Sequence, residues 1–409
     1  MEYISVKDAA AKWGVSERYA QRCCTEGRVE GAVKFGRAWA IPPNAEKPAD
    51  KKAAASDAEK TDAEELPDEN KQAEPEQKLR QALPLINTPY KLGSVTESID
   101  KIEDADTRNI ALAEYYYFSG QSAKASDIVE EYLTNKDLAL RLSACLLYAY
   151  ANLALDRIPR ARQALAQIRS TAEAVDESTP AIYRAYSVCV SACANVLLHL
   201  PLPETTVPMK QFIHILPAGL RLLALYAEAH HAYLKKQYGA CVGIAETALA
   251  IEGELYPIPA IYLHLVAAMG YINMKQPQQA KENLLEAWKI AQPDDMIEAF
   301  GEHHGLLGGM LEAVIKKDYP DDFKRMISIT YSFSAGWRKI HNPDTGHYVA
   351  DDLTTTEFTV AMLAARGWSN KEIASHLDVS TNTIKMHISA VLQKLGISQR
   401  KDLSQFMLR

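Results

Sequence analysis

Helix-capping residues near the end of the chain constrain its fold more strongly than any other sequence feature. Three stretches between residues 353 and 407 begin with a side chain that can accept a backbone N–H at a helix start: Thr354, Ser369 and Ser380. Glu357 and Glu372 stand three positions after the first two, which completes the spacing of a capping box. Gly396 is suited to end the third stretch. The pattern predicts three short helices in this segment.

The third of these helices has two unlike faces. Its apolar positions recur at helical spacing: Ile384, Ile388, Val391, Leu392 and Leu395. Its other face is polar apart from one methionine: Thr381, Asn382, Lys385, Met386 and Ser389. A tight turn at Asp378 and Val379 precedes this helix. The arrangement is typical of a helix-turn-helix, whose second helix enters the major groove of DNA.

The same segment resembles the DNA-binding domain of the LuxR-type transcriptional regulators. The resemblance rests on the stretches GWSNKEIASHLDVS, TIKMHIS and KLGISQR, which lie in one ungapped span. It implies a four-helix domain that dimerises through its last helix and reads the major groove. We therefore expect double-stranded DNA as a partner and a homodimer as the binding form.

The roles of individual residues in this domain follow from the resemblance alone. Lys385 and Met386 stand where the family touches base edges. The positions where phosphates are usually met are Ser380, Thr383, His387, Lys394 and Arg400. Thr381, Asn382 and Ser389 complete the predicted DNA-binding face. Because Ser389 sits where some relatives carry a basic residue, no base preference carries over.

Charge is distributed along the chain in a way that suits a DNA-binding end. The chain of 409 residues has a net charge of -7, yet basic residues outnumber acidic ones from Leu353 onward. The excess of acidic residues therefore lies in the rest of the chain. A chain of this length is too long for one compact core, so we expect roughly two to four domains.

A second, smaller helix-turn-helix is predicted at residues 1–43. Ser5 and Asp8 can cap a helix that Gly14 ends, and Ser16 can cap the helix that follows. Strand-like spacing comes next, at Val29, Val33, Phe35, Trp39 and Ile41. Two helices followed by a hairpin indicate a small winged helix.

This segment resembles the excisionase-like, MerR-related DNA-binding domains. The shared features are the GVS turn, the residues EGR after the second helix and the FGRAWAIP wing. The resemblance would place four side chains against the major groove: Ser16, Arg18, Tyr19 and Arg22. Lys34 and Arg37 on the wing would meet backbone phosphates. Domains of this kind can also bind protein or carry no site of their own, and these alternatives stay open.

Residues 44–81 are expected to form a disordered, acidic linker. They are rich in Ala, Glu, Lys, Asp and Pro, with no aromatic and almost no aliphatic residues, so they cannot bury a core. A flexible chain of this length spans about 30–35 Å, which is close to one turn of DNA. The N-terminal unit could thus contact DNA beside the site of the C-terminal domain.

From Leu83 to about Tyr348 the pattern predicts one helix after another. A small residue recurs twelve positions after another small residue in four pairs: Ala113 and Ala125, Ala149 and Ala161, Ala229 and Cys241, Ala268 and Ala280. Small residues at these points let paired helices approach closely, and the spacing resembles tetratricopeptide repeats. A degenerate unit is expected at Pro180–Pro217, where Pro201, Pro203 and Pro208 lengthen the loop. Residues 82–350 should therefore form an α-solenoid of tetratricopeptide-like helical hairpins.

Tyrosines recur on the first helices of the hairpins, and four of them are candidates for a ligand or partner surface: Tyr116, Tyr150, Tyr233 and Tyr271. The alternative is packing between repeats, which we expect for most tyrosines of the array. The pairs His230–His231 and His303–His304 resemble metal ligands. However, neighbouring residues on a helix point about 100° apart, so we expect surface or hydrogen-bonded histidines instead and no metal.

Motifs of catalysis and of membrane insertion are missing from the sequence. It contains no GxxxxGK[ST] phosphate loop, no HExxH and no Gly-x-Ser-x-Gly, so we expect neither an enzyme nor a cofactor. The six cysteines lie inside helical patterns, which favours buried thiols over disulfides. The start of the chain does not resemble a signal peptide, and no uncharged run suits a membrane span. We expect a bacterial, cytoplasmic protein.

The sequence therefore predicts a mainly α, multi-domain chain: a winged helix-turn-helix at 1–43, a linker at 44–81, a repeat domain at 82–350 and a LuxR-type four-helix domain at 351–409. The predicted function is sequence-specific, DNA-binding regulation of transcription, in which the repeat domain senses a ligand or a partner. The alternative is an interaction scaffold, whose repeats recruit a protein and whose terminal domains tether it to DNA. The sequence does not identify the effector or the operator.

Overall fold

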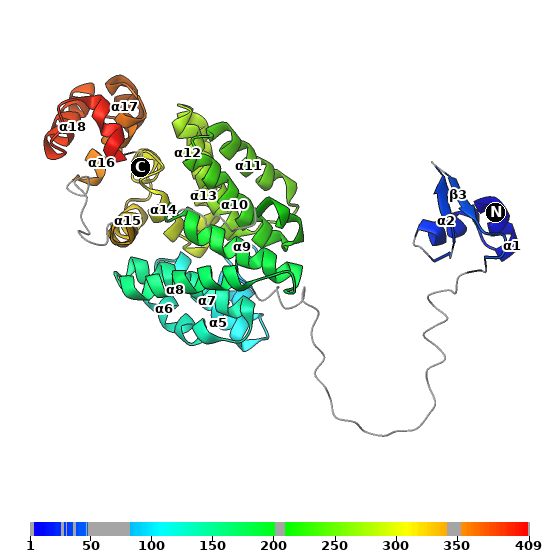
Figure 1. Ribbon diagram of the computed structural model, residues 1–409. Coiled ribbons are helices and arrows are strands. Elements are labelled where there is room, and N and C mark those ends of the chain that lie inside the picture. The colour runs from blue at the N-terminus through cyan, green and yellow to red at the C-terminus, as the bar shows by residue number, and fades with distance from the viewer. Residues whose placement is uncertain are drawn as a thin grey trace. The chain divides into compact units, whose positions relative to one another are not determined.

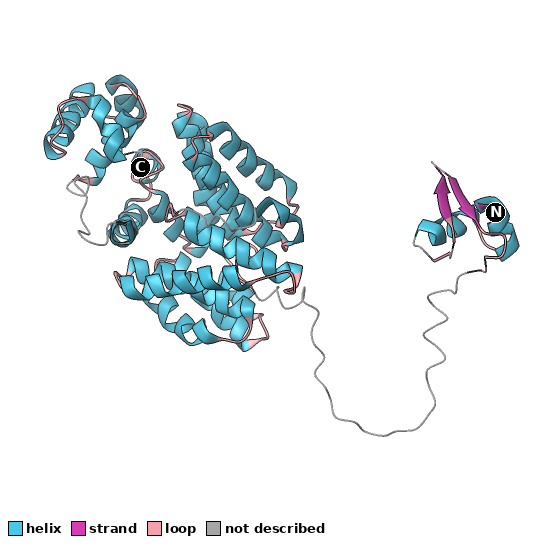
Figure 2. Ribbon diagram, in the orientation of Figure 1, coloured by secondary structure: helices cyan, strands magenta, loops and turns pink. Residues whose placement is uncertain are grey.

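The structure is a computed structural model that describes residues 4–25, 28–29, 31–35, 38–45, 47, 82–200, 209–341 and 353–407. The chain divides into two compact units, one before residue 72 and one after it. The described residues are mainly helical, with a small sheet in the first unit (Figures 1 and 2). This confirms the predicted mainly α class.

The first unit consists of two helices and a three-stranded sheet. Its elements are β1 Ile4–Ser5, α1 Val6–Trp13, α2 Glu17–Thr25, β2 Val33–Phe35 and β3 Ala38–Ile41. The capping box of Ser5 with Asp8 is present, and Gly14 takes the left-handed conformation after α1. The predicted hairpin is β2–β3, and β1 adds an antiparallel third strand along β3, in the order β1-β3-β2. Strand β1 was not predicted from the sequence.

A compact apolar core holds this first unit together. It contains small residues from both helices, with Trp13, Val29 and Ile41 around them. The Trp13 Nε1–H donates to the carbonyl of Ala45 at 3.0 Å, which ties α1 to the chain beyond β3. Almost all of the predicted linker, 44–81, lies outside the described residues.

The second unit begins with paired helices that follow one another along the chain. They are α4 Val95–Asp100, α5 Ala105–Phe118, α6 Ser122–Val129, α7 Leu138–Ala154, α8 Ile158–Ala174, α9 Ala181–Val196, α10 Ala218–Leu234, α11 Tyr238–Ile251, α12 Pro257–Asn273, α13 Pro277–Ala291, α14 Glu298–His303 and α15 Pro320–His341. Short 3-10 turns follow α6 (Glu130–Thr134) and α13 (Gln292–Asp294), and a π-helical turn spans Leu311–Ile315. The prediction of successive helical hairpins is confirmed here.

The small-residue pairs lie where the helices of a hairpin pack. All eight residues are buried, with at most 2% of each exposed: Ala113, Ala125, Ala149, Ala161, Ala229, Cys241, Ala268 and Ala280. A longer side chain at these points would hold the two backbones apart. The alanine spacing thus reflects a packing requirement that recurs in each hairpin.

The turn between paired helices also repeats, in a form that the sequence pattern did not reveal. Seven positions after the first small residue, the backbone enters the left-handed region, at Gly120, Asp156, Lys236 and Lys275. The next residue donates its N–H five positions back along the chain, for example from Gln276 N to Tyr271 O at 2.9 Å. This is a Schellman cap. Only one of the four turns uses glycine, so composition alone did not mark them.

The predicted degenerate unit is irregular, as expected. Helix α9 is followed by two short 3-10 turns, Met209–Gln211 and Ile213–Ile215, where the other units have a second helix. The three prolines predicted to lengthen this loop lie at 201–208, outside the described residues.

Residues 82–93 differ from the prediction, which expected helix from Leu83 onward. They form turns without a helix, and the segment 82–86 is fully buried in the repeat domain. The N–H groups of Leu85 and Ile86 donate to the two carboxyl oxygens of Glu114, at 2.8 and 3.1 Å. Side-chain partners in the array, Glu114 here and Ser143 for the N–H of Leu83, thus replace hydrogen bonds that a helix would supply.

Glu114 makes the stability of this unit depend on pH. Burial raises its pKa from 4.5 to about 8, although the two backbone N–H groups act in the opposite direction. A carboxyl group that holds its proton more tightly in the folded chain than in the unfolded chain contributes to the free energy of unfolding. This contribution is present in full at pH values below the ordinary pKa of the group. That contribution is lost as pH rises through the folded value. The loss is on the order of 3 kcal/mol at pH 7.

We therefore predict that the melting temperature of the second unit falls between pH 5 and pH 8, and that Glu114→Gln flattens this fall. The exposed Glu97 on α4 provides the control, since Glu97→Gln should leave the slope as it is. Thermal unfolding followed by circular dichroism at several pH values measures both. If the melting temperature of Glu114→Gln fell with pH as steeply as that of the unmodified chain, the Glu114 carboxyl would not be the cause of the pH dependence.

The C-terminal domain packs directly on the repeat domain. Its elements are α16 Thr355–Ala365, α17 Asn370–Leu377, α18 Thr381–Lys394, a 3-10 turn at Arg400–Leu403 and α19 Ser404–Met407. The turn and α19 stand where the resemblance implied a fourth helix. Both capping boxes and the Ser380 cap are present, so the predicted helix starts are confirmed.

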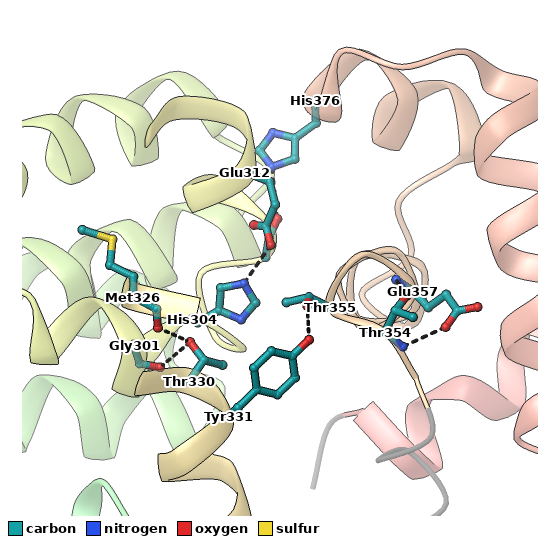
Figure 3. Close-up of polar contacts among 11 residues, drawn as sticks. Gly301, His304, Glu312, Met326, Thr330, Tyr331, Thr354, Thr355, Glu357 and His376 are labelled. Atoms are coloured by element: carbon teal, nitrogen blue, oxygen red, sulfur yellow. Dashed lines mark hydrogen bonds and ion pairs between the residues drawn. The ribbon is translucent and has the colours of Figure 1, made fainter. Parts of the chain in front are cut away.

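Hydrogen bonds join the two domains at several points. The Arg366 guanidinium donates to the Tyr233 hydroxyl at 3.0 Å and to the Leu306 carbonyl at 3.2 Å. Figure 3 shows another contact, between the hydroxyl groups of Tyr331 and Thr355 at 2.7 Å. These contacts explain why residues 82–350 and 351–409, predicted as separate domains, fall in one compact unit.

His376 of α17 supplies a further contact, with its Nε2 3.1 Å from the carbonyl of Gly308. Burial lowers the pKa of His376, so its imidazole is neutral near pH 7. The bond then requires the tautomer with a proton on Nε2. His304 and Glu312, which lie on the repeat side of this junction, pair at 2.8 Å (Figure 3).

Glycines make this close approach possible. A Cβ on Gly309 would lie 2.4 Å from Thr359 Cγ2 and 2.9 Å from Leu377 Cδ2, both in the C-terminal domain. Thr359 is buried and β-branched, so it cannot turn aside. Gly309 also has a φ of +79°, which disfavours other residues.

We predict that Gly309→Ala destabilises the docked C-terminal domain by about 1–3 kcal/mol more than Gly367→Ala does. Gly367 is a matched control, because its φ is +78° but a Cβ there would meet nothing within 4 Å. Thermal unfolding gives the two losses, and hydrogen exchange shows whether α16 and α17 become less protected. Equal losses of stability in the two variants would mean that the close contact of Gly309 with Thr359 and Leu377 does not stabilise the docked domain.

Within the described residues, no helix has both the length and the hydropathy that crossing a membrane requires. All six cysteines are buried and unpaired, as predicted. The Tyr226 hydroxyl lies 2.9 Å from His230 Nδ1 and 2.8 Å from His303 Nε2, so each predicted histidine pair has a member in the hydrogen-bonded core. No group of three or more potential metal ligands occurs in the described part of the chain.

Candidate nucleic-acid interface

The helix-turn-helix is formed by α17, a short turn and α18. The turn is possible because Asp378 adopts the left-handed conformation, with φ of 53°, and its N–H bonds the carbonyl of Ala374. Ser380 then accepts the N–H of Thr383 at 3.0 Å and begins α18. Caps on both sides of the turn therefore fix the angle at which α18 leaves α17.

Helix α18 is divided into two faces as predicted. Ile384, Ile388 and Val391 are buried against the rest of the domain. The opposite face is exposed at Thr381, Asn382, Lys385, Met386 and Ser389. Met386 is 72% exposed, which is unusual for so large an apolar side chain. Such a face can meet base edges by hydrogen bonds and by apolar contact with a thymine methyl group.

The remaining predicted residues of α18 border this face. Ser380 is exposed, while Thr383 and His387 are half-buried. The hydroxyl groups of Ser380 and Thr383 lie 2.8 Å apart, so the helix cap already occupies part of their hydrogen-bonding capacity. Phosphate contact by these residues remains a prediction.

Two predicted phosphate contacts are engaged within the domain. Lys394 Nζ lies 2.7 Å from Glu357 Oε2, which links the end of α18 to the start of α16. The Arg400 guanidinium donates to the carbonyl of Trp368 and to Asn370 Oδ1 at the start of α17. Burial lowers the pKa of Arg400. In this structure both side chains join elements of the domain.

In the first unit, the predicted residues of α2 lie on its outer side. Ser16, Arg18 and Arg22 are exposed, and Tyr19 is half-buried with the Arg22 guanidinium 5.5 Å from its ring centre. Lys34 on β2 is exposed, with Nζ 5.8 Å from the ring centre of Trp39. Arg37 lies outside the described residues. DNA contact by this unit stays a prediction.

The four tyrosines predicted for a ligand surface have different surroundings. Tyr116 is half-buried beneath Lys124, and the hydroxyl of the half-buried Tyr271 donates to Glu246. Tyr150 is buried, with its hydroxyl bonded to the carbonyls of Cys193 and Ala194. Tyr233 is buried at the junction with the C-terminal domain. The four residues therefore do not share one open face.

The geometry defines residues 353–407 as a helix-turn-helix domain with its second helix exposed. Comparison with known families agrees, since residues 351–407 match the family described as bacterial regulatory proteins, luxR family. This domain is therefore of the LuxR type, as its resemblance implied.

Curated relatives carry the description HTH-type transcriptional regulator MalT. The protein from Vibrio campbellii is 30% identical over 154 residues, which cover 34% of this chain and 17% of the relative. The Vibrio cholerae protein is 30% identical over 157 residues, with the same coverage. The protein from Klebsiella pneumoniae is 39% identical over 69 residues, covering 17% of this chain and 8% of the relative. The matches thus span under a fifth of these relatives, and no solved structure matches.

We predict that Arg400→Ala lowers the stability of the C-terminal domain by about 1–3 kcal/mol, because a partly buried, charge-assisted set of hydrogen bonds is lost. The neighbouring Lys401 is exposed, so Lys401→Ala should change stability by less than about 0.5 kcal/mol. Chemical denaturation and hydrogen exchange at α17 measure the difference. If Arg400→Ala leaves stability unchanged, its side chain is free for phosphate contact instead.

Proposed function

We propose that this chain is a sequence-specific, DNA-binding regulator of transcription, whose repeat domain senses a ligand or a protein partner. The observation that carries the proposal is the exposed polar face of α18 in an intact LuxR-type helix-turn-helix. In such domains the first helix crosses the DNA backbone while the second enters the major groove. Here those are α17 and α18.

The way the domain is docked supports this proposal. The junction uses Thr359 of α16 and His376 and Leu377 of α17, while the polar face of α18 remains exposed. Docking on the repeat domain is therefore compatible with an accessible recognition helix. A homodimer would present two such helices to a two-fold related site.

Control by an effector follows from the same junction. A ligand or partner that binds one arrangement of the two domains better than another shifts the population toward that arrangement. Because the repeat domain contacts α16 and α17 directly, an event in the array has a short physical path to the DNA-binding helix.

We predict that Lys385→Ala weakens binding to a specific site by about 1–3 kcal/mol, because a contact to a base edge is lost. Genome-wide footprinting would first supply the site, and fluorescence anisotropy on that duplex would give the affinities. Lys289→Ala, at an exposed position of α13 in the repeat domain, is the control and should bind as the unmodified chain does. Equal affinities for Lys385→Ala and the control would refute the proposal for α18.

A further inference from the structure

A cleft of about 550 Å³ opens between the repeat domain and the C-terminal domain. Helix α13 forms one wall and α17 the other, with Met310 and Val314 between them. This volume lies within the range of small-molecule sites, which often occur where domains meet. Nothing in the sequence pattern pointed to this cleft, since its walls come from segments far apart in the chain.

Three lysines give the cleft a positive charge. Lys275 is already engaged, because its Nζ donates to the Gly367 carbonyl at 3.0 Å and lies 3.4 Å from the Glu372 carboxylate. Lys281 on α13 and Lys371 on α17 are exposed on opposite walls. Neither of these two forms a hydrogen bond or an ion pair with another described residue. Two positive charges therefore remain for an occupant.

The backbone adds to this charge. Pro277 and Gln278, in the first turn of α13, line the cleft, and the residue before them, Gln276, supplies no side-chain cap. Ser369 and Lys371, at the start of α17, line the other side. The N-termini of both helices carry partial positive charge, which favours an anion. Of the two, only α13 keeps uncapped N–H groups, because Ser369 and Glu372 form a capping box at α17.

The apolar part of the cleft points to an occupant with an organic body. Ala313 is exposed and Val314 half-buried in the lining of the cleft, while Met310 is 1% and Trp368 4% exposed there. The indole N–H of Trp368 is buried and has no hydrogen-bond partner among the described residues. The ring lies 5.2 Å from that of His376, which also lines the cleft. A bare phosphate ion would leave this surface unused.

We propose that the cleft binds a small phosphorylated metabolite that contacts both domains and so acts as the effector. Lys281 and Lys371 pair with the phosphate oxygens from opposite walls, while the organic body packs on Ala313 and Val314. An occupant held by both walls stabilises the docked arrangement of the C-terminal domain, because it binds that arrangement better than a separated one. This inference rests on the proposed function for its regulatory meaning, but not for binding.

The test uses the full chain with two probes, inorganic phosphate and phenyl phosphate, at matched ionic strength. Both should protect the first turns of α13 and α17 from hydrogen exchange, and phenyl phosphate should do so at lower concentration. The double variant Lys281→Ala/Lys371→Ala should raise the dissociation constant of phenyl phosphate by about tenfold or more, as expected for the loss of charge-assisted hydrogen bonds. Its melting temperature without probe should not change, because both side chains are exposed.

The matched control is Lys289→Ala, an exposed lysine on α13 that does not line the cleft. It should bind phenyl phosphate as the unmodified chain does. Equal binding by the double variant, or protection that appears elsewhere in the chain, would overturn the proposal. So would a second outcome, in which neither probe protects the cleft and the double variant instead weakens DNA binding with a smaller salt slope. The cleft would then belong to the DNA footprint.

The proposed function and this inference can fail separately. If Lys385→Ala leaves DNA binding intact while phenyl phosphate still binds between α13 and α17, the assignment of α18 is wrong and the cleft assignment holds. If Lys385→Ala abolishes specific DNA binding while the probes bind nowhere in the chain, the reverse is true.

Discussion

Close approach between helix backbones, permitted by small buried side chains, is the constraint on which the second unit depends. Within each hairpin the contact is made by alanine or cysteine, and at the junction with the C-terminal domain it is made by glycine. The difference has a physical reason. A hairpin has a fixed turn that brings its helices together, whereas the junction joins surfaces far apart in sequence and needs the closest approach available.

The junction also decides which face of the C-terminal domain stays accessible. Arg366, Thr359 and Leu377 face the repeat domain, and α18 presents its polar side to solvent. The contacts between the C-terminal domain and the repeat domain therefore do not need to break before α18 can reach DNA. In the proposed regulator, a signal would therefore act on the placement of the domain, and in the proposed homodimer on how two copies of α18 are spaced, more than on the exposure of a single helix.

The sequence predicted best those features that depend on a few neighbouring residues. The capping pairs Thr354–Glu357 and Ser369–Glu372 form as expected because each bond spans only three positions. The two faces of α18 followed from helical periodicity in the same way. The alanine spacing predicted the hairpins because each one closes within a short stretch of chain.

Features that depend on distant residues could not be predicted from the pattern. The bonds of Lys394 to Glu357 and of Arg400 to residues at the start of α17 span 30 or more positions, and no local pattern predicts them. Phosphate contact by both side chains stays a prediction. Tyr233 was a candidate for a ligand or partner surface, and its hydrogen bond with Arg366, 133 positions further along the chain, could not be predicted from the sequence. The left-handed conformation at Asp156, Lys236 and Lys275 was not predicted for another reason, since glycine, the usual residue in that conformation, is absent there.

The buried segment 82–86 has a consequence for peptide recognition by the repeat domain. Leu83 and Ile86 line a cavity of about 50 Å³ together with side chains of α5, α7, α10 and α12. The chain thus fills part of the interior of the repeat domain with its own residues. Such a tethered occupant has an effective concentration on the order of millimolar, so a free peptide of equal intrinsic affinity would rarely displace it at cellular concentrations.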